Sequence, residues 1–180
     1  MQTLDKFQTE KERGQDLLFS DESLLPAHLP QVSDLRPTHN LSAIFDECHN
    51  YIYANEGLLK EKIFHEMVKL LVMKLLDEQS TNDGSVNFGV TQTESRQVKH
   101  TQTGTFLLRI RELYQKVRNK FPNLFPDDSL KLRPQTITRV VGLLQFLSLS
   151  QTPGDVKGEA FQAFVARHQR GDRGEFFTPH

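Results

Sequence analysis

The residues that could support chemistry in this chain are few and scattered. Seven histidines, one cysteine and the adjacent carboxylates Asp127 and Asp128 are the candidates for a metal or catalytic site. His49 and His65 fall on different predicted helices, and no His-x-x-x-His spacing occurs. Because a zinc site needs three or four converging ligands, the sequence predicts no metal. We interpret His49 as a core or interface histidine.

Nucleophilic catalysis is no better supported by the sequence. Cys48 lies on the apolar face of a predicted helix, where burial raises the pKa of a thiol and leaves it unreactive. No Gly-x-Ser-x-Gly motif occurs, and Asp127 and Asp128 belong to a predicted, solvated turn. One cysteine cannot form an internal disulfide, which fits a reducing compartment. With no apolar signal core and no run of about 18 apolar residues, we expect a cytoplasmic protein without membrane contact.

Charge is distributed very unevenly along the chain. Residues 1–95 carry 8 Lys and Arg against 16 Asp and Glu, a net charge of −8. Residues 96–139 carry 10 against 3, a net charge of +7, and residues 140–180 are balanced. The second segment, called the basic block, would favour a polyanion through counterion release. The alternative is that its cations pair with the acidic first half of the chain.

Within the basic block, six lysines and arginines are chiefly expected to contact phosphate groups or a partner. They are Arg96, Lys99, Lys116, Arg118, Lys120 and Arg133.

Periodicity predicts that helices position these residues. Apolar residues at helical spacing begin near residue 38, with Asn40 as a cap and Gly57 as the left-handed end of the first helix. The second helix, about 59–78, is apolar around most of its circumference, which is typical of a central helix. A third follows over about 106–117, and Pro134 is placed at the first position of a fourth. Asp155 is expected to cap a fifth.

The remaining segments read as connections. Residues 1–36 form a polar tail that can lie against the domain, and residues 79–103 form a long polar loop with a possible short strand at Val86, Phe88 and Val90. The fold class is therefore all-α, a bundle of about five helices.

Several stretches resemble the modification subunit of type I restriction systems, an adenine-specific DNA methyltransferase. The most specific is residues 155–179, which begins Asp-Val-Lys-Gly-Glu-Ala-Phe and ends in a glycine-punctuated charged loop followed by Phe-Phe-Thr-Pro. Upstream, Cys-His-Asn-Tyr-Ile-Tyr-Ala-Asn-Glu-Gly (48–57) and Glu-Met-Val-Lys-Leu-Leu (66–71) are similar to the first two helices of that family. The resemblance covers residues 38–180.

The resemblance implies three regions: a tail at 1–36, a helical N-terminal domain at 37–170, and the start of an α/β catalytic domain at 171–180. In this family the last segment lines the S-adenosylmethionine pocket. The implied cofactor contacts are Glu175, Phe176, Phe177, Thr178, Pro179 and His180. The chain has no Gly-x-Gly and no Asn-Pro, so the catalytic aromatic that would stack on a flipped adenine is absent. We therefore expect a piece of a longer enzyme, with no catalytic residues and no activity alone.

The resemblance also implies partners for the longer enzyme: double-stranded DNA and a specificity subunit, with a second modification subunit and a restriction subunit as further candidates. The helical domain would clamp DNA and dock the specificity subunit. Two alternatives stay open from the residues themselves: a stand-alone helical adaptor, and a nucleic-acid-binding module acting through the basic block.

Overall fold

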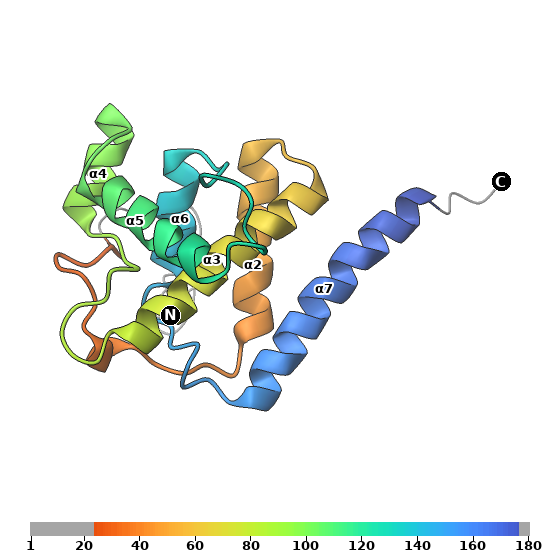
Figure 1. Ribbon diagram of the computed structural model, residues 1–180, viewed down its shortest axis with the longest axis horizontal. Helices are drawn as coiled ribbons and strands as arrows, with labels where there is room; N and C mark the ends of the chain where they lie inside the picture. The colour runs from red at the N-terminus through yellow and green to blue at the C-terminus, as the bar shows by residue number, and fades with distance from the viewer. Residues whose placement is uncertain (1–23, 177–180) are drawn as a thin grey trace, which may run out of the picture.

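The computed structural model describes residues 24–176 and shows a helical bundle with no β-strand in that range (Figure 1). After a short 3-10 helix, η2 (Val32–Asp34), come six α-helices. They are α2 (Leu41–Glu56), α3 (Lys60–Ser80), α4 (Gln92–Thr101), α5 (Thr105–Lys120), α6 (Pro134–Leu144) and α7 (Gly154–Phe176). The predicted all-α class is confirmed.

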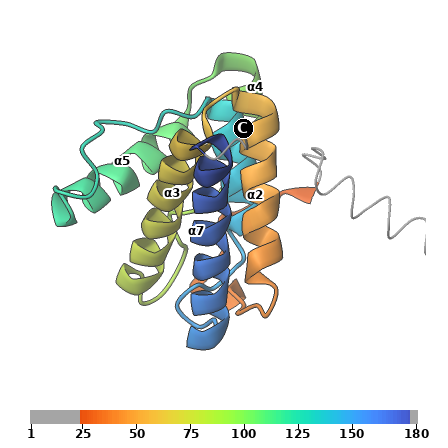
Figure 2. The same ribbon diagram turned by 90° about the vertical axis from the view of Figure 1, so that its right-hand side faces the viewer.

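The helices form one core with α2 and α3 at its centre. Figure 2 shows α2, α3 and α7 side by side, and α2 also packs on α6, while α5 packs on α3. The predicted apolar face of α2 is buried, since Phe45, Cys48 and Ile52 are at most 1% exposed. Gly57 ends α2 at φ 63° and Pro134 begins α6, as predicted. Asn40 precedes α2, but its side chain makes no capping hydrogen bond.

The predicted loop at 79–103 is wrong over its second half, which forms α4. Thr91 and Glu94 cap this helix reciprocally: Glu94 N donates to Thr91 Oγ1 (3.2 Å), and Thr91 N donates to Glu94 Oε2 (3.1 Å). This Thr-x-x-Glu pattern is a capping box and was present in the sequence. Periodicity missed the helix because only Ser95 and Val98 of α4 are buried.

The possible strand at Val86, Phe88 and Val90 is also wrong. These three side chains are buried, but their backbone donors are not paired in a ladder. Phe88 N donates to the Asp77 carboxylate (2.8 Å), and Val90 N donates to Gln145 Oε1 (3.0 Å). The alternation therefore reflects burial of an irregular loop rather than a sheet.

Part of the predicted tail belongs to the folded unit. Val86 N donates to Pro30 O (2.9 Å), Ser148 N donates to Arg36 O (2.7 Å), and Leu35 is 4% exposed. Residues 24–36 thus link the α3–α4 loop to the segment after α6. Residues 1–23 lie outside the described range.

The helix α7 is longer than predicted. The glycine-punctuated segment at 170–174, expected as a loop, continues α7 to Phe176, and the expected start of a new domain at residue 171 falls inside this helix. A helical glycine costs only about 1 kcal/mol relative to alanine, and the surrounding arginine, glutamine and glutamate residues favour helix. Asp155 lies in the first turn of α7 rather than before it. Figure 1 shows the C-terminal end of α7 projecting away from the other helices.

The central helix α3 carries buried charges that its apolar pattern did not predict. Asp77 accepts hydrogen bonds from Asn87 N and Phe88 N (both 2.8 Å). Glu78 accepts from Leu149 N (3.0 Å), and Lys74 Nζ lies 3.7 Å from Glu78 Oε1. Burial lowers the pKa of Lys74 from 10.5 to about 8, even though Glu78 and Asp77 favour its charged form.

We predict that Lys74 makes stability depend on pH in the alkaline range. Because its pKa is lower in the folded protein, the unfolded chain binds more protons between pH 8 and 10.5, and stability rises over that window. The free energy of unfolding of the wild type should rise by about 3 kcal/mol relative to Lys74→Met between these pH values. Urea denaturation at several pH values measures this difference. The control is Leu75→Met, and profiles of wild type and Lys74→Met that stay parallel would contradict the prediction.

Candidate partner and nucleic-acid interface

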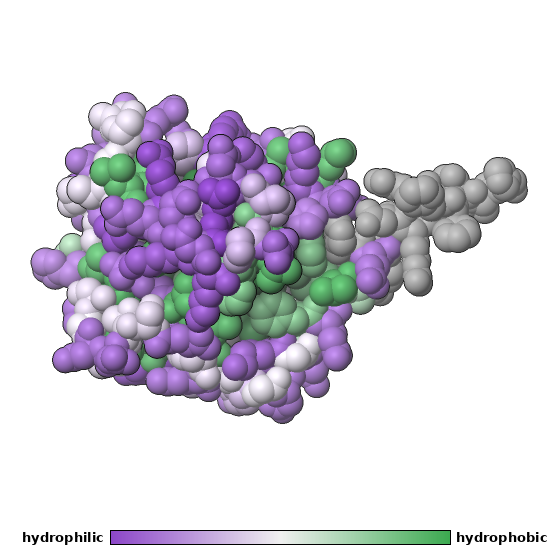
Figure 3. Space-filling view, viewed as in Figure 1, coloured by the Kyte–Doolittle hydropathy of each residue, from purple (hydrophilic) through white to green (hydrophobic). Residues whose placement is uncertain are grey.

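An apolar groove runs along the outer face of α3. It has a volume of about 660 Å³ and is walled by α3 on one side and by residues 121–127 on the other. The apolar side chains of the α3 wall recur at helical spacing and are Phe64, Val68, Val72, Leu75 and Leu76. Figure 3 shows hydrophobic surface exposed on this side of the molecule, in the region between the end of α5 and α7. We call this feature the α3 groove.

The opposite wall adds exposed apolar side chains. Leu124 is 70% exposed, and Phe121 and Phe125 line the groove beside it. At one end the groove meets α7, because the ring of Phe64 stacks on Phe164 with centroids 5.0 Å apart and planes at 20°. An open, continuous apolar surface of this kind marks an interaction site more often than isolated exposed residues do.

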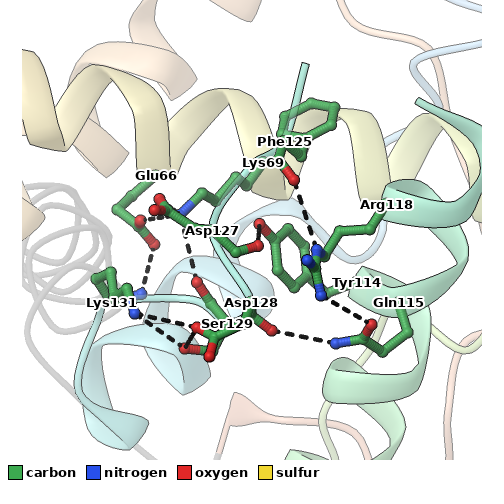
Figure 4. Close-up of polar contacts among 10 residues, drawn as sticks. All are labelled: Glu66, Lys69, Tyr114, Gln115, Arg118, Phe125, Asp127, Asp128, Ser129 and Lys131. Atoms are coloured by element: carbon green, nitrogen blue, oxygen red, sulfur yellow. Dashed lines mark hydrogen bonds and ion pairs between the residues drawn. The ribbon is translucent and has the colours of Figure 1, made fainter. Parts of the chain in front are cut away.

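A buried polar network fixes the 121–131 segment against α3 (Figure 4). Lys69 Nζ donates to Glu66 Oε1 (2.5 Å) and to Asp127 Oδ2 (2.8 Å). The second oxygen of Glu66 accepts from Lys131 N (2.9 Å), and Tyr114 donates its hydroxyl to Asp127 O (2.8 Å). The network thus ties α3 and α5 to the loop and sets the position of the second groove wall.

Hydrogen bonds within this network favour the charged forms of Lys69 and Asp127. Burial alone would lower the pKa of Lys69, but hydrogen bonds to Asp127 and Glu66 outweigh burial and raise it. The hydrogen bond from Lys69 in turn lowers the pKa of Asp127. Both Lys69 and Glu66 are only 3% exposed, so each depends on the other for compensation.

The structure does not gather the six predicted cations on one patch. Arg96 and Lys99 lie on α4, whereas Lys116, Arg118 and Lys120 lie on the last two turns of α5. Lys116 and Lys120 are one turn apart and both exposed, and Lys120 also lines the α3 groove. The α5 group therefore adjoins the groove, and the α4 group lies apart from it.

Several cations of the basic block instead stabilise the fold. Arg133 Nε lies 3.6 Å from Glu56 Oε1, and its backbone N donates to the same oxygen (2.9 Å). Arg118 donates to Phe125 O (3.5 Å), and Arg109 pairs with Glu94 (2.7 Å). The alternative of pairing with the acidic first half thus applies to Arg109 and Arg133.

Only two of the six predicted cofactor residues belong to the described part of the chain. Glu175 and Phe176 form the last turn of α7, while Phe177, Thr178, Pro179 and His180 lie outside the described residues. Within residues 24–176 no group of three His, Cys, Asp or Glu side chains could hold a metal ion. Burial raises the pKa of Cys48 to about 12, as its position on the apolar face predicted.

Two further findings concern membrane crossing and similarity to known proteins. No helix in the described range combines the length and the apolar content that crossing a bilayer requires. Comparison with protein-family models, with curated proteins and with solved structures finds no match to this chain. The interpretation of function therefore depends on the residues and on the geometry above.

Sequence reasoning missed the α3 groove and the Lys69 network. One signal was available, because Glu66 and Lys69 form an i, i+3 pair inside an otherwise apolar helix. The contribution of Asp127, 58 residues further along, had no comparable signal.

We predict that Lys69→Met lowers the free energy of unfolding by about 3–5 kcal/mol, since it leaves Glu66 buried without a counter-charge. The double variant Glu66→Gln/Lys69→Met should recover most of that loss, because it removes both buried charges together. Urea denaturation of both variants tests this. The control Lys131→Met, at an exposed lysine, should stay close to wild type, and a double variant as unstable as the single one would contradict the prediction.

Proposed function

We propose that this chain is the N-terminal helical domain of an S-adenosylmethionine-dependent, adenine-specific DNA methyltransferase of the type I modification-subunit kind. The observation that carries the proposal is the resemblance of residues 155–179, which end in Phe-Phe-Thr-Pro. The helical fold of the described residues agrees with the helical N-terminal domain that the resemblance implies. In the complete enzyme, residues 175–180 would form one wall of the S-adenosylmethionine pocket.

The α3 groove supports a docking role for the domain. Five α3 side chains at helical spacing facing a groove of about 660 Å³ suit an amphipathic helix laid along it. The partner in this proposal is the specificity subunit, and the exposed lysines of α5 beside the groove would contact DNA phosphates or acidic residues of that partner. Phosphate contacts of this kind position a protein on DNA without reading its sequence.

A second candidate is a helical adaptor without catalysis, and the same groove favours it. An adaptor requires only the apolar α3 face and its fixed second wall, both of which lie within the described residues. The methyltransferase proposal requires a catalytic domain in addition to this chain, whereas the adaptor proposal does not.

We predict that the coding sequence continues past His180 into a glycine-rich strand–turn and an Asn-Pro-Pro-aromatic motif. The extended protein should transfer a radiolabelled methyl group from S-adenosylmethionine to adenine in DNA when the specificity subunit is present. Replacing the aromatic residue of that motif should abolish transfer. A stop codon directly after His180 would contradict the methyltransferase and favour the adaptor.

We also predict the salt dependence of DNA binding by this chain. Replacing Arg96, Lys116 and Lys120 with Glu should weaken binding by a similar factor for DNA duplexes of different sequence. It should reduce the slope of log affinity against log salt by about one unit per lost contact. Fluorescence anisotropy titrations at several salt concentrations provide both quantities.

The matched control for this experiment reverses Lys60, Lys62 and Lys157, which makes the same change in net charge on other helices. If the control changes the slope as much as the test variant, the effect is one of net charge. The claim of contacts on α4 and α5 is then wrong.

A further inference from the structure

A second hollow lies on another part of the molecule, between α4 and α6. Its volume is about 350 Å³, within the range of about 300–1,000 Å³ that is typical of small-molecule sites. Val98 of α4, Leu143 and Phe146 at the end of α6, and Leu25 supply apolar walls, and Tyr51 of α2 adds an aromatic ring. We call this feature the α4–α6 pocket.

The charged side chains of the α4–α6 pocket have a single sign. Lys99 and Arg139 both line it, and none of its described lining residues is acidic. Arg139 is half-buried, and its guanidinium carbon lies 5.7 Å from the centre of the Tyr51 ring. Burial is the largest influence on Arg139 and lowers its pKa, although Glu47 and Tyr51 act in the opposite direction.

Hydrogen bonds and close packing hold several residues around the α4–α6 pocket in place. Gln145, 1% exposed, accepts from Val90 N (3.0 Å), which joins the α3–α4 loop to the end of α6. Thr138 donates its hydroxyl to Pro134 O (2.8 Å) within α6. Gly142 lets Leu25 approach, since a Cβ added there would lie 3.3 Å from Leu25 Cδ2. The pocket is thus largely preformed, which lowers the ordering cost of binding.

From this geometry we infer that the α4–α6 pocket binds a small organic anion with an apolar or aromatic body. The apolar walls and the Tyr51 ring take the body, and the Arg139 guanidinium and the Lys99 ammonium take a carboxylate, sulfonate or phosphate group. A guanidinium in a partly desolvated site binds such groups more strongly than one in water does. Lys99 then serves the pocket rather than DNA. The inference does not rest on the methyltransferase proposal.

The test uses two dyes that share a body and differ in charge: 1-anilinonaphthalene-8-sulfonate and its uncharged relative N-phenyl-1-naphthylamine. On the full chain, fluorescence titration should show one saturable sulfonate site, with the uncharged dye binding at least about tenfold more weakly. Arg139→Gln should weaken sulfonate binding by about tenfold and leave the uncharged dye unaffected. Arg111→Gln, at an exposed arginine of α5 that does not line the pocket, should change neither.

A matched pair of tryptophan variants locates the site. Leu143→Trp fills the α4–α6 pocket and should abolish sulfonate binding, whereas Leu124→Trp, in the wall of the α3 groove, should leave it intact. The inference is overturned if Leu124→Trp removes binding and Leu143→Trp does not. It is equally overturned if the two dyes bind alike, or if the folded chain shows no saturable binding. Should Leu143→Trp fail to fold, Arg139→Gln still decides the question.

Discussion

Three buried carboxylates of α3 organise the loops around the bundle. Glu66 accepts from Lys131 N, Asp77 from Asn87 N and Phe88 N, and Glu78 from Leu149 N. These segments lie before α6, before α4 and before α7 respectively, so three connections are fastened to the same helix. A buried backbone donor without a partner is costly. Irregular segments can pack here because α3 supplies the acceptors that a sheet would otherwise provide.

This arrangement requires compensating charge on the same helix. Glu66 and Glu78 have Lys69 and Lys74 three or four residues away, which the 3.6-residue period places beside them. The two pairs are not equivalent, since the pKa of Lys69 is raised and that of Lys74 is lowered. Lys69 Nζ donates to a second acid, Asp127, at 2.8 Å, whereas Lys74 Nζ lies 3.7 Å from Glu78 Oε1 and 5.5 Å from the centre of the Phe88 ring. Of the two, the Lys69 pair is the one that shapes a groove wall.

The sequence predicted those features that depend on a few neighbouring residues. The buried face of α2, the left-handed Gly57 and the start of α6 at Pro134 follow from spacing and from backbone preference. It failed where partners are distant or where polar residues are buried. The helix α4 has a capping box but almost no apolar stripe, and α7 continues through Gly171 and Gly174, each of which costs only about 1 kcal/mol relative to alanine. Neither hollow was foreseen, since each is walled by segments far apart in the chain, such as Leu76 and Leu124.

The shape of α7 has a mechanical consequence. With 23 residues at about 1.5 Å each, this helix is roughly 35 Å long. Among the residues of α7 whose burial is described, the buried side chains are Ala160 and Phe164. The part of the helix beyond Phe164 is roughly 18 Å long, and its end projects away from the other helices (Figure 1). A tilt of only about 10° at the Phe64–Phe164 stack would move the far end by about 3 Å. Small repacking of aromatic rings inside the bundle is thus amplified at the end of α7 into a displacement as large as the diameter of a water molecule.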